Sequence, residues 1–273
     1  MGGLWDSEAC SRKGVEVRFF SSAPNLFQLL RDGKHGAIHL SLLFRHLKLR
    51  FNSCGTRHVF AFDQQAVQTL SVRSEFISAI TGRQSLFGLE LSDNKVEGLA
   101  DYFELVLEQN PFLHLVAPCS AEEFAVRHIL ESLTLLEYLP QNAHFADVGT
   151  GAGLPSIPCM IVRDDLGAVL IESKEKKTRF LESTVAELGI ADRVEIINRQ
   201  FSETTLAGES LVTCRAIDRF VDVVPRLLKW GKGRSFAFFG GPAVGEALIR
   251  SKVPFTKKLI PYSDQRFIYF FEH

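Results

Sequence analysis

Apolar residues follow two different periods along the chain, and each period predicts one kind of element. Between residues 96 and 107 the apolar positions recur every three or four residues, as on one face of a helix. The same spacing returns between Ser120 and Pro140, and Glu123, three residues after Ser120, predicts a capping box at the start of that helix. Two helices are therefore expected before the first strand.

From residue 144 onward, short apolar runs alternate with amphipathic stretches. Helices are predicted at 155–162, 174–188 and 219–228, and strands at 144–148, 168–171, 194–197, 211–214 and 235–239. Regular alternation of this kind builds a parallel sheet with helices on both faces. Only Tyr262 to Gln265 separate the last two apolar runs, 255–261 and 266–271, which predicts an antiparallel hairpin. We therefore expect an α/β fold: a Rossmann-like, seven-stranded, mostly parallel sheet with a C-terminal antiparallel hairpin, preceded by a helical cap.

The pattern divides the chain into an N-terminal extension, residues 1–84, and a main domain, residues 85–273, whose N-terminal helices lie within 92–139. The best helix candidate of the extension is 37–51. Three interpretations of the extension stay open: an accessory RNA-binding segment, an organelle-targeting leader, or sequence translated upstream of the true start. Acidic residues at 6, 8 and 16 count against the leader, because transit peptides avoid acids.

Composition narrows the class of protein. Hydrophobic residues make up 46% and charged residues 23% of the 273 positions, which excludes global disorder. The net charge of -1 provides no chain-wide attraction to nucleic acid, so an RNA partner would need a local basic patch. The five cysteines lack the two-residue spacing of zinc and dithiol sites, so we expect no metal. No apolar run is long enough to span a bilayer, and we expect a cytoplasmic protein without membrane contact.

The candidate chemistry begins directly after the first predicted strand, with DVGTGAGLP at 147–155. Its three alternating glycines let the backbone approach a small polar ligand. Glu172, at the end of the second strand, stands where a carboxylate can accept both hydroxyls of a ribose. The dinucleotide fingerprint G-x-G-x-x-G would need its third glycine at Leu154, so a nicotinamide oxidoreductase is disfavoured. The plainer alternative is a tight turn made for packing only.

This loop resembles motif I of the class I S-adenosylmethionine-dependent methyltransferases. The longer pattern of 147–158, followed by Glu172 and by Cys214 with Arg215, closely resembles the GidB/RsmG family of bacterial small-subunit (16S) ribosomal RNA guanine-N7 methyltransferases. Upstream, RHILES at 127–132 is similar to that family's Arg-His-x-x-Asp-Ser element. The resemblance runs from about Leu91 to the C-terminus and implies S-adenosylmethionine as cofactor and 16S ribosomal RNA, or the small ribosomal subunit, as partner.

The resemblance also implies roles for individual residues. Asp147 would face the cationic methionine end of the cofactor. The full set of expected cofactor-binding residues is Asp147, Gly149, Gly151, Gly153, Leu154, Glu172, Gln200, Phe201 and Arg215. Departures from the family pattern include Gln200-Phe201 in place of Ala-Glu, Phe239 in place of a lysine, and 114–116 in place of Asn-Leu-Thr. Substrate identity is therefore less firmly implied than cofactor identity.

The implied reaction needs few catalytic groups, because N7 of guanine carries a lone pair and no proton, and alignment with the methyl donor suffices. The catalytic candidates are Arg215, which would position the cofactor or the guanine, and His128, which would hold a flipped base or a phosphate or else simply pack in the core. The expected RNA-binding residues are Arg127, Lys174, Lys176, Lys177 and Arg179. We expect a monomer. Two alternatives stay open: a different methyl acceptor, and an RNA-binding or ribosome-binding protein with a vestigial cofactor pocket.

Overall fold

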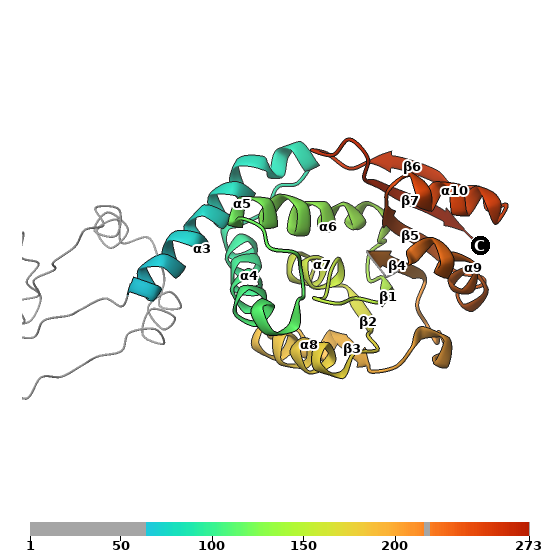
Figure 1. Ribbon diagram of the computed structural model, residues 1–273, viewed down its shortest axis with the longest axis horizontal. Helices are drawn as coiled ribbons and strands as arrows, with labels where there is room; N and C mark the ends of the chain where they lie inside the picture. Colours follow the sequence, from blue (N-terminus) through green and yellow to red (C-terminus); the bar gives the residue numbers. More distant parts are fainter. Residues whose placement is uncertain (1–63, 216–218, 273) are drawn as a thin grey trace, which may run out of the picture. The chain divides into compact units, whose positions relative to one another are not determined.

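The computed structural model describes residues 64–215 and 219–272, and Figure 1 shows their arrangement. Every element from η1 onward belongs to one compact unit that begins at Arg73. The predicted helix at 37–51 lies outside the described residues, and the predicted domain boundary after residue 84 stays a prediction.

A seven-stranded sheet forms the centre of this compact unit, in the order β3-β2-β1-β4-β5-β7-β6. The first five strands in this order are mutually parallel, and β7 runs antiparallel between β5 and β6. This confirms the predicted fold class, including the C-terminal hairpin. The strands are β1 (His144–Val148), β2 (Gly167–Ile171), β3 (Val194–Ile197), β4 (Leu211–Arg215), β5 (Ser235–Gly240), β6 (Thr256–Leu259) and β7 (Phe267–Glu272).

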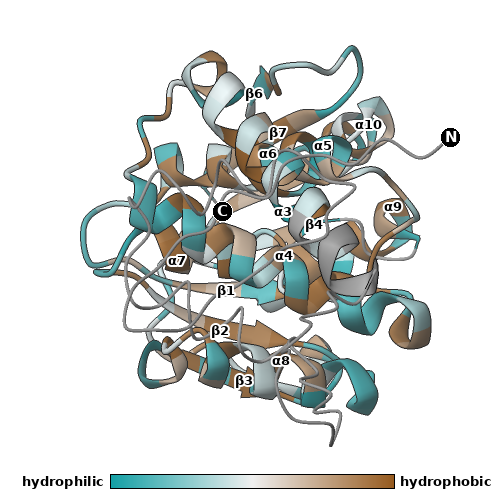
Figure 2. Ribbon diagram, turned by 90° about the vertical axis from the view of Figure 1, so that its left-hand side faces the viewer, coloured by the Kyte–Doolittle hydropathy of each residue, from teal (hydrophilic) through white to brown (hydrophobic). Residues whose placement is uncertain are grey.

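Burial along the strands explains their order. Four of the five residues of β1, of β2 and of β4 are buried, as expected of central strands covered on both faces. All four residues of β6 are exposed, and Lys257 and Lys258 protect this free edge from pairing with another chain. Figure 2 shows the same contrast, with strands β1 and β2 mainly in the hydrophobic colour and polar residues on the surrounding helices.

Helices cover the sheet in two groups. Helix α4 packs against α7 and α8, and α9 packs against α10 beside β5 and β7 (Figure 1). The sequence missed α3 and α10, since neither has a clean apolar period between clear start and stop signals. The longer helices are α3 (Gln64–Arg83), α4 (Asp93–Leu113), α7 (Ser156–Val162), α8 (Glu175–Glu187), α9 (Phe220–Trp230) and α10 (Pro242–Arg250), and the short 3-10 turns are η1 (Gln84–Phe87), η4 (Ala191–Arg193) and η5 (Phe201–Glu203).

The second predicted helix is continuous but irregular. It consists of α5 (Ala121–Phe124), η2 (Ala125–Leu130), α6 (Glu131–Leu133) and η3 (Thr134–Tyr138). Ser120 caps its start as predicted, since its side-chain oxygen accepts a hydrogen bond from the amide of Glu123 at 3.1 Å. Segment η2 is a π-helical turn, a form that is rare and common at functional sites. Arg127 and His128 lie on this turn.

Candidate functional site

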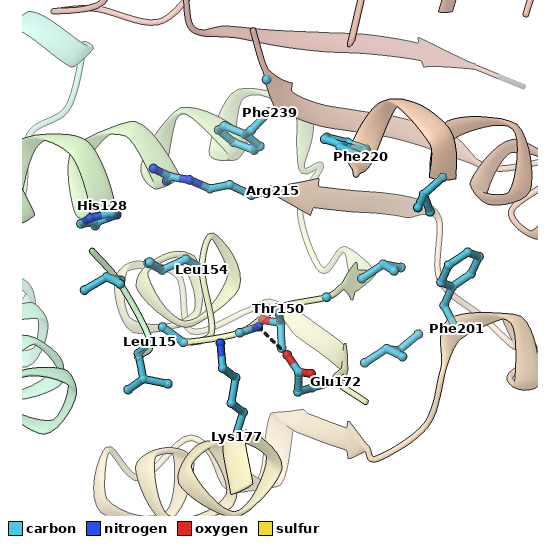
Figure 3. A pocket seen from close by; sticks show the side chains of 18 of the residues that line it. Leu115, His128, Thr150, Leu154, Glu172, Lys177, Phe201, Arg215, Phe220 and Phe239 are labelled. Atoms are coloured by element: carbon cyan, nitrogen blue, oxygen red, sulfur yellow. Dashed lines mark hydrogen bonds between the residues drawn. The ribbon is translucent and has the colours of Figure 1, made fainter. Parts of the chain in front are cut away.

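A cavity of about 890 Å³ lies at the carboxyl ends of the parallel strands, where the strand order reverses between β1 and β4. Open α/β sheets bind their ligands at this switch point. The volume stands at the upper end of the range for ligand pockets, roughly 300–1,000 Å³, so the cavity has room for more than one small ligand. Figure 3 shows the glycine loop and Glu172 on one side and Arg215 with Phe239 on the other.

The glycine loop forms part of the cavity wall as predicted. Gly151 has a φ of +59°, and nothing lies closer than 3.9 Å to the position where a Cβ would stand. Gly153 has a φ of +95°, and a Cβ there would come within 2.3 Å of the Ile157 side chain. Gly149, Gly151 and Leu154 line the cavity, whereas Gly153 serves the close packing of the loop on α7.

Glu172 is fixed against the loop by main-chain amides. Its Oε2 accepts a hydrogen bond from the amide of Gly151 at 3.1 Å, and its Oε1 accepts one from the amide of Lys174 at 2.8 Å. The carboxylate is 6% exposed and lines the cavity. Each oxygen keeps a further lone pair for a ligand hydroxyl. This geometry agrees with the ribose-binding role that the sequence predicts for Glu172.

Asp147 differs from its expected role. Its side chain is fully buried beneath the loop and does not line the cavity. Oδ2 accepts hydrogen bonds from the hydroxyls of Thr150 and Ser156, each at 2.7 Å, while Oδ1 is buried without a partner. Burial raises the pKa of Asp147 to about 7, against the opposing effect of those hydroxyls. The carboxyl therefore holds the loop in shape, and direct contact with a cationic ligand is not what this arrangement provides.

One of the departures that the sequence identified, Gln200-Phe201, lies at the far end of the cavity. Gln200 and Phe201 line it after β3, and Phe201 is 6% exposed. The guanidinium carbon of Arg226 stands 5.4 Å from the Phe201 ring centroid, and the indole of Trp230 meets the ring edge-on at 5.5 Å. The aromatic ring of Phe201 thus forms the cavity wall at the position where the family pattern has an acidic residue.

Arg215, at the end of β4, reaches across the cavity to the irregular helix. Its Nη1 donates to the hydroxyl of Ser132 at 2.8 Å, and its Nη2 donates to the carbonyl of Arg127. Its guanidinium carbon also stands 5.8 Å from the Phe239 ring centroid. Burial lowers the pKa of Arg215, but an arginine stays charged in proteins. The side chain therefore presents a fixed cation on the side opposite Glu172.

His128 lines the cavity near Arg215, as Figure 3 shows. Its ring packs against Phe124 with centroids 5.0 Å apart. Burial, together with the positive charges of Arg215, Arg127 and Arg266, lowers the pKa of His128 to about 3. The imidazole is therefore neutral near pH 7 and offers one donor and one acceptor rather than a cation. The catalytic role of His128 stays a prediction.

The predicted RNA-binding residues separate into two places. Arg127, Lys174 and Lys177 line the cavity, the last of these extending from α8 toward the loop (Figure 3). Lys176 and Arg179 instead line a second, shallower hollow between α4 and α8. RNA binding by this group stays a prediction.

Sequence reasoning missed several residues of the site, among them Tyr102 and Arg266. The hydroxyl of Tyr102, buried on α4, donates to the carbonyl of Ala152 in the loop at 2.8 Å, and only the tertiary fold brings them together. Arg266 lines the cavity and pairs with Glu131. A signal for Arg266 was present, because it precedes the last strand, and the start of an antiparallel strand lies at the carboxyl edge of its parallel neighbours.

Two known proteins that are similar in sequence to this chain share one name. A family model described as rRNA small subunit methyltransferase G (GidB) matches residues 95–262. The chain is 32% identical over 174 residues to a protein named ribosomal RNA small subunit methyltransferase G from Pelotomaculum thermopropionicum, covering 60% of this chain and 72% of that one. It is 34% identical over 137 residues to a protein of the same name from Neisseria meningitidis, covering 50% of this chain and 66% of that one.

Among solved structures, a SAM-dependent methyltransferase from Aquifex aeolicus superposes with a TM-score of 0.46 at 14% identity. The match covers 62% of this chain and 97% of that one. At this level the structural likeness supports no conclusion about function.

Neither a metal-binding cluster nor a helix able to cross a membrane occurs among residues 64–215 and 219–272. Groups of three or more histidine, cysteine or acidic side chains close enough to share an ion are absent there. The helices in the same ranges are either too short or too polar to span a bilayer.

Proposed function

The chain belongs to the family of ribosomal RNA small subunit methyltransferase G, and we propose that it transfers the methyl group of S-adenosylmethionine to N7 of a guanine in 16S ribosomal RNA. Membership confirms the predicted family, the predicted class of enzyme and the predicted cofactor. The cavity that joins the glycine loop, Glu172 and Arg215 at the switch point of the sheet carries the proposal.

The residues present fit a sulfonium nucleoside. Gly151 leaves open space at the loop, and Glu172 offers its carboxylate to a ribose. Gln200 and Phe201 would border the adenine, and Leu154 would border the reacting end. When bound, the cofactor supplies an electrophilic methyl group. These assignments rest on the cavity lining and on the family pattern.

The acceptor side suits a reaction that needs no general base. His128 is neutral and a weak base, and the carboxylate of Glu131 is engaged in hydrogen bonds. N7 of guanine needs no deprotonation, so these residues only have to orient the base and exclude water. Since the guanine must leave its stack to reach the cavity, Arg215 and His128 would contact the unstacked base.

The proposed function also implies a partner, 16S ribosomal RNA, and a location, the cytoplasm. The rim residues Arg127, Lys174 and Lys177 would meet RNA phosphates, and the cytoplasm is where this substrate is found. A monomer suffices, because the cavity is built within one chain.

The test is methyl transfer to 30S subunits and to deproteinised 16S ribosomal RNA that lack the modification, with mapping of the product. We expect one N7-methylguanosine per RNA. Normal cofactor binding without transfer to either substrate would refute the acceptor assignment. Methylation of a different acceptor from a bacterial extract would support the alternative acceptor instead.

A further inference from the structure

A single buried carboxylate joins two cations of the cavity. Glu131, the first residue of α6, is 1% exposed and lines the cavity. Its Oε1 accepts hydrogen bonds from Nε of Arg266 at 2.9 Å and from Nη2 of Arg266 at 2.5 Å. Its Oε2 lies 3.4 Å from Nη2 of Arg215. The three residues come from α6, from the segment just before β7 and from the end of β4.

The charges at this place require such an arrangement. Arg215 and Arg266 both line the cavity, and their side chains are 13% and 35% exposed. Arg127 adds a third guanidinium from the π-helical turn. Like charges repel strongly where water is scarce, so the two arginines would move apart without an anion between them. Glu131 is the carboxylate that lies between them.

We propose that Glu131 is the positioning residue of the acceptor side: it fixes Arg266 beside Arg215 so that both guanidiniums face the methyl acceptor. The contacts of Glu131 use Nε and Nη2 of Arg266, and its Nη1 makes none of these bonds. Arg215 has two further anchors, Ser132 and the carbonyl of Arg127, so Arg266 depends more strongly on Glu131. This inference rests on the proposed function.

The length of the Glu131 side chain matters for this contact. The related family element has aspartate where this chain has Glu131, and the longer side chain has the reach for the two hydrogen bonds that Oε1 accepts from Arg266. Nε and Nη2 of Arg266 both donate to Oε1, and Nε also lies 3.2 Å from Oε2, so these charge-assisted hydrogen bonds hold the guanidinium in position. Glu131→Asp keeps the charge and withdraws it by one methylene, whereas Glu131→Gln keeps the shape and removes the charge.

The experiment measures methyl transfer to the small subunit or its RNA for Glu131→Gln, Arg266→Gln and the double variant. We expect Glu131→Gln to lower kcat/KM about 100-fold, as misplacement of a positioning group does. In the Arg266→Gln background, Glu131→Gln should reduce kcat/KM by a factor at least about tenfold smaller than in the parent protein, because Glu131 has already lost its partner there. Glu131→Asp should keep at least about a tenth of the activity of the parent protein.

Glu137→Gln is the matched control. Glu137 joins the same irregular helix to the same hairpin through Lys258, at 2.5 Å, but lies outside the cavity. We expect no change in activity for this variant. Cofactor affinity, measured without RNA, should stay within about threefold of that of the parent protein for every variant, since the glycine loop and Glu172 lie on the other side of the cavity. Additive effects of the two single substitutions, or a parallel loss of cofactor affinity and stability, would overturn the proposal.

A second measurement does not depend on activity. The Nε proton of Arg266 should exchange slowly with solvent in the parent protein and fast in Glu131→Gln, as followed by NMR of labelled arginine side chains. Fast exchange in the parent protein would overturn the positioning role even if the RNA is methylated. An inactive parent protein with slow exchange at Arg266 would refute the proposed acceptor and leave the positioning role supported.

Discussion

A side chain at Gly151 would enter the cavity beside Glu172. Its amide donates to Glu172, and the space beside its Cα is open toward Lys177, whose Nζ lies 3.9 Å from the position of a Cβ. We expect Gly151→Asp to abolish cofactor binding, because it places a carboxylate next to Glu172 in the space that a ligand would fill. Calorimetric titration with S-adenosylmethionine measures this.

Gly151→Asn is the matched control for that substitution. Asparagine and aspartate both tolerate a positive φ, so the two variants share the same backbone and differ in charge. We expect Gly151→Asn to bind measurably, although more weakly than the parent protein. Equal affinity of Gly151→Asp and the parent protein would contradict the placement of the cofactor.

Asp147 predicts a pH dependence of stability. Its pKa is raised to about 7 in the folded protein, from 3.8 for the unperturbed group. Between these values the unfolded chain loses a proton that the folded protein keeps, so folding loses up to about 1.4 kcal/mol per pH unit as the pH rises. Asp147→Asn does not titrate, and its amide oxygen can still accept from Thr150 and Ser156.

The free energy of unfolding of Asp147→Asn, relative to the parent protein, should therefore rise by roughly 2 kcal/mol between pH 5 and pH 8. Urea unfolding at the two pH values measures the difference. If the free energies of unfolding of the two proteins differed by the same amount at pH 5 and at pH 8, Asp147 would be ionised in the folded protein throughout this range.

At the scale of elements, helix α4 supports the glycine loop through one hydroxyl. Tyr102 is fully buried, and burial raises the pKa of its phenol, so it donates to Ala152 as a neutral group. We expect Tyr102→Phe to lower the free energy of unfolding by about 1–2 kcal/mol, because a buried carbonyl loses its partner. Cofactor affinity should fall as well, since the loop loses this anchor. Chemical unfolding and calorimetry measure the two effects.

Tyr262→Phe is the control for Tyr102. Tyr262 is 60% exposed in the turn between β6 and β7, and removal of its hydroxyl should change stability by less than about 0.5 kcal/mol. If Tyr102→Phe changed neither the free energy of unfolding nor the cofactor affinity, α4 would not support the glycine loop.

At the scale of the whole molecule, the net charge is only -1, so RNA binding depends on where the basic residues lie. Lys174 and Arg127 stand at the cavity, whereas Lys232 lies before β5, at the opposite edge of the sheet. We expect Lys174→Gln to weaken RNA binding and to reduce the slope of log affinity against log salt concentration by about 1, as one lost phosphate contact does. Binding titrations between low and high salt measure the slope.

Lys232→Gln changes the net charge by the same amount and serves as the control. It should leave both the affinity and the slope unchanged. An equal loss of RNA affinity in Lys174→Gln and Lys232→Gln would mean that binding depends on the net charge of the protein and not on the rim of the cavity.

The sequence by itself determined the features that depend on neighbouring residues. Alternating apolar runs are enough to place β1 to β5, because each strand carries its burial pattern in its own four to six residues. The glycine spacing at 149, 151 and 153 and the position of Glu172 predict the loop and its carboxylate for the same reason, since backbone conformation and strand ends are local properties.

Only the tertiary structure decided which distant side chains meet. Arg266 and Glu131 are 135 residues apart, and Tyr102 and Ala152 are 50 apart. Whether Asp147 faces the cavity or the core depends on the packing of Thr150 and Ser156 around it. No local pattern encodes these contacts, because they arise when the sheet brings its carboxyl edge and the covering helices together, and burial then selects the partners that each polar group finds.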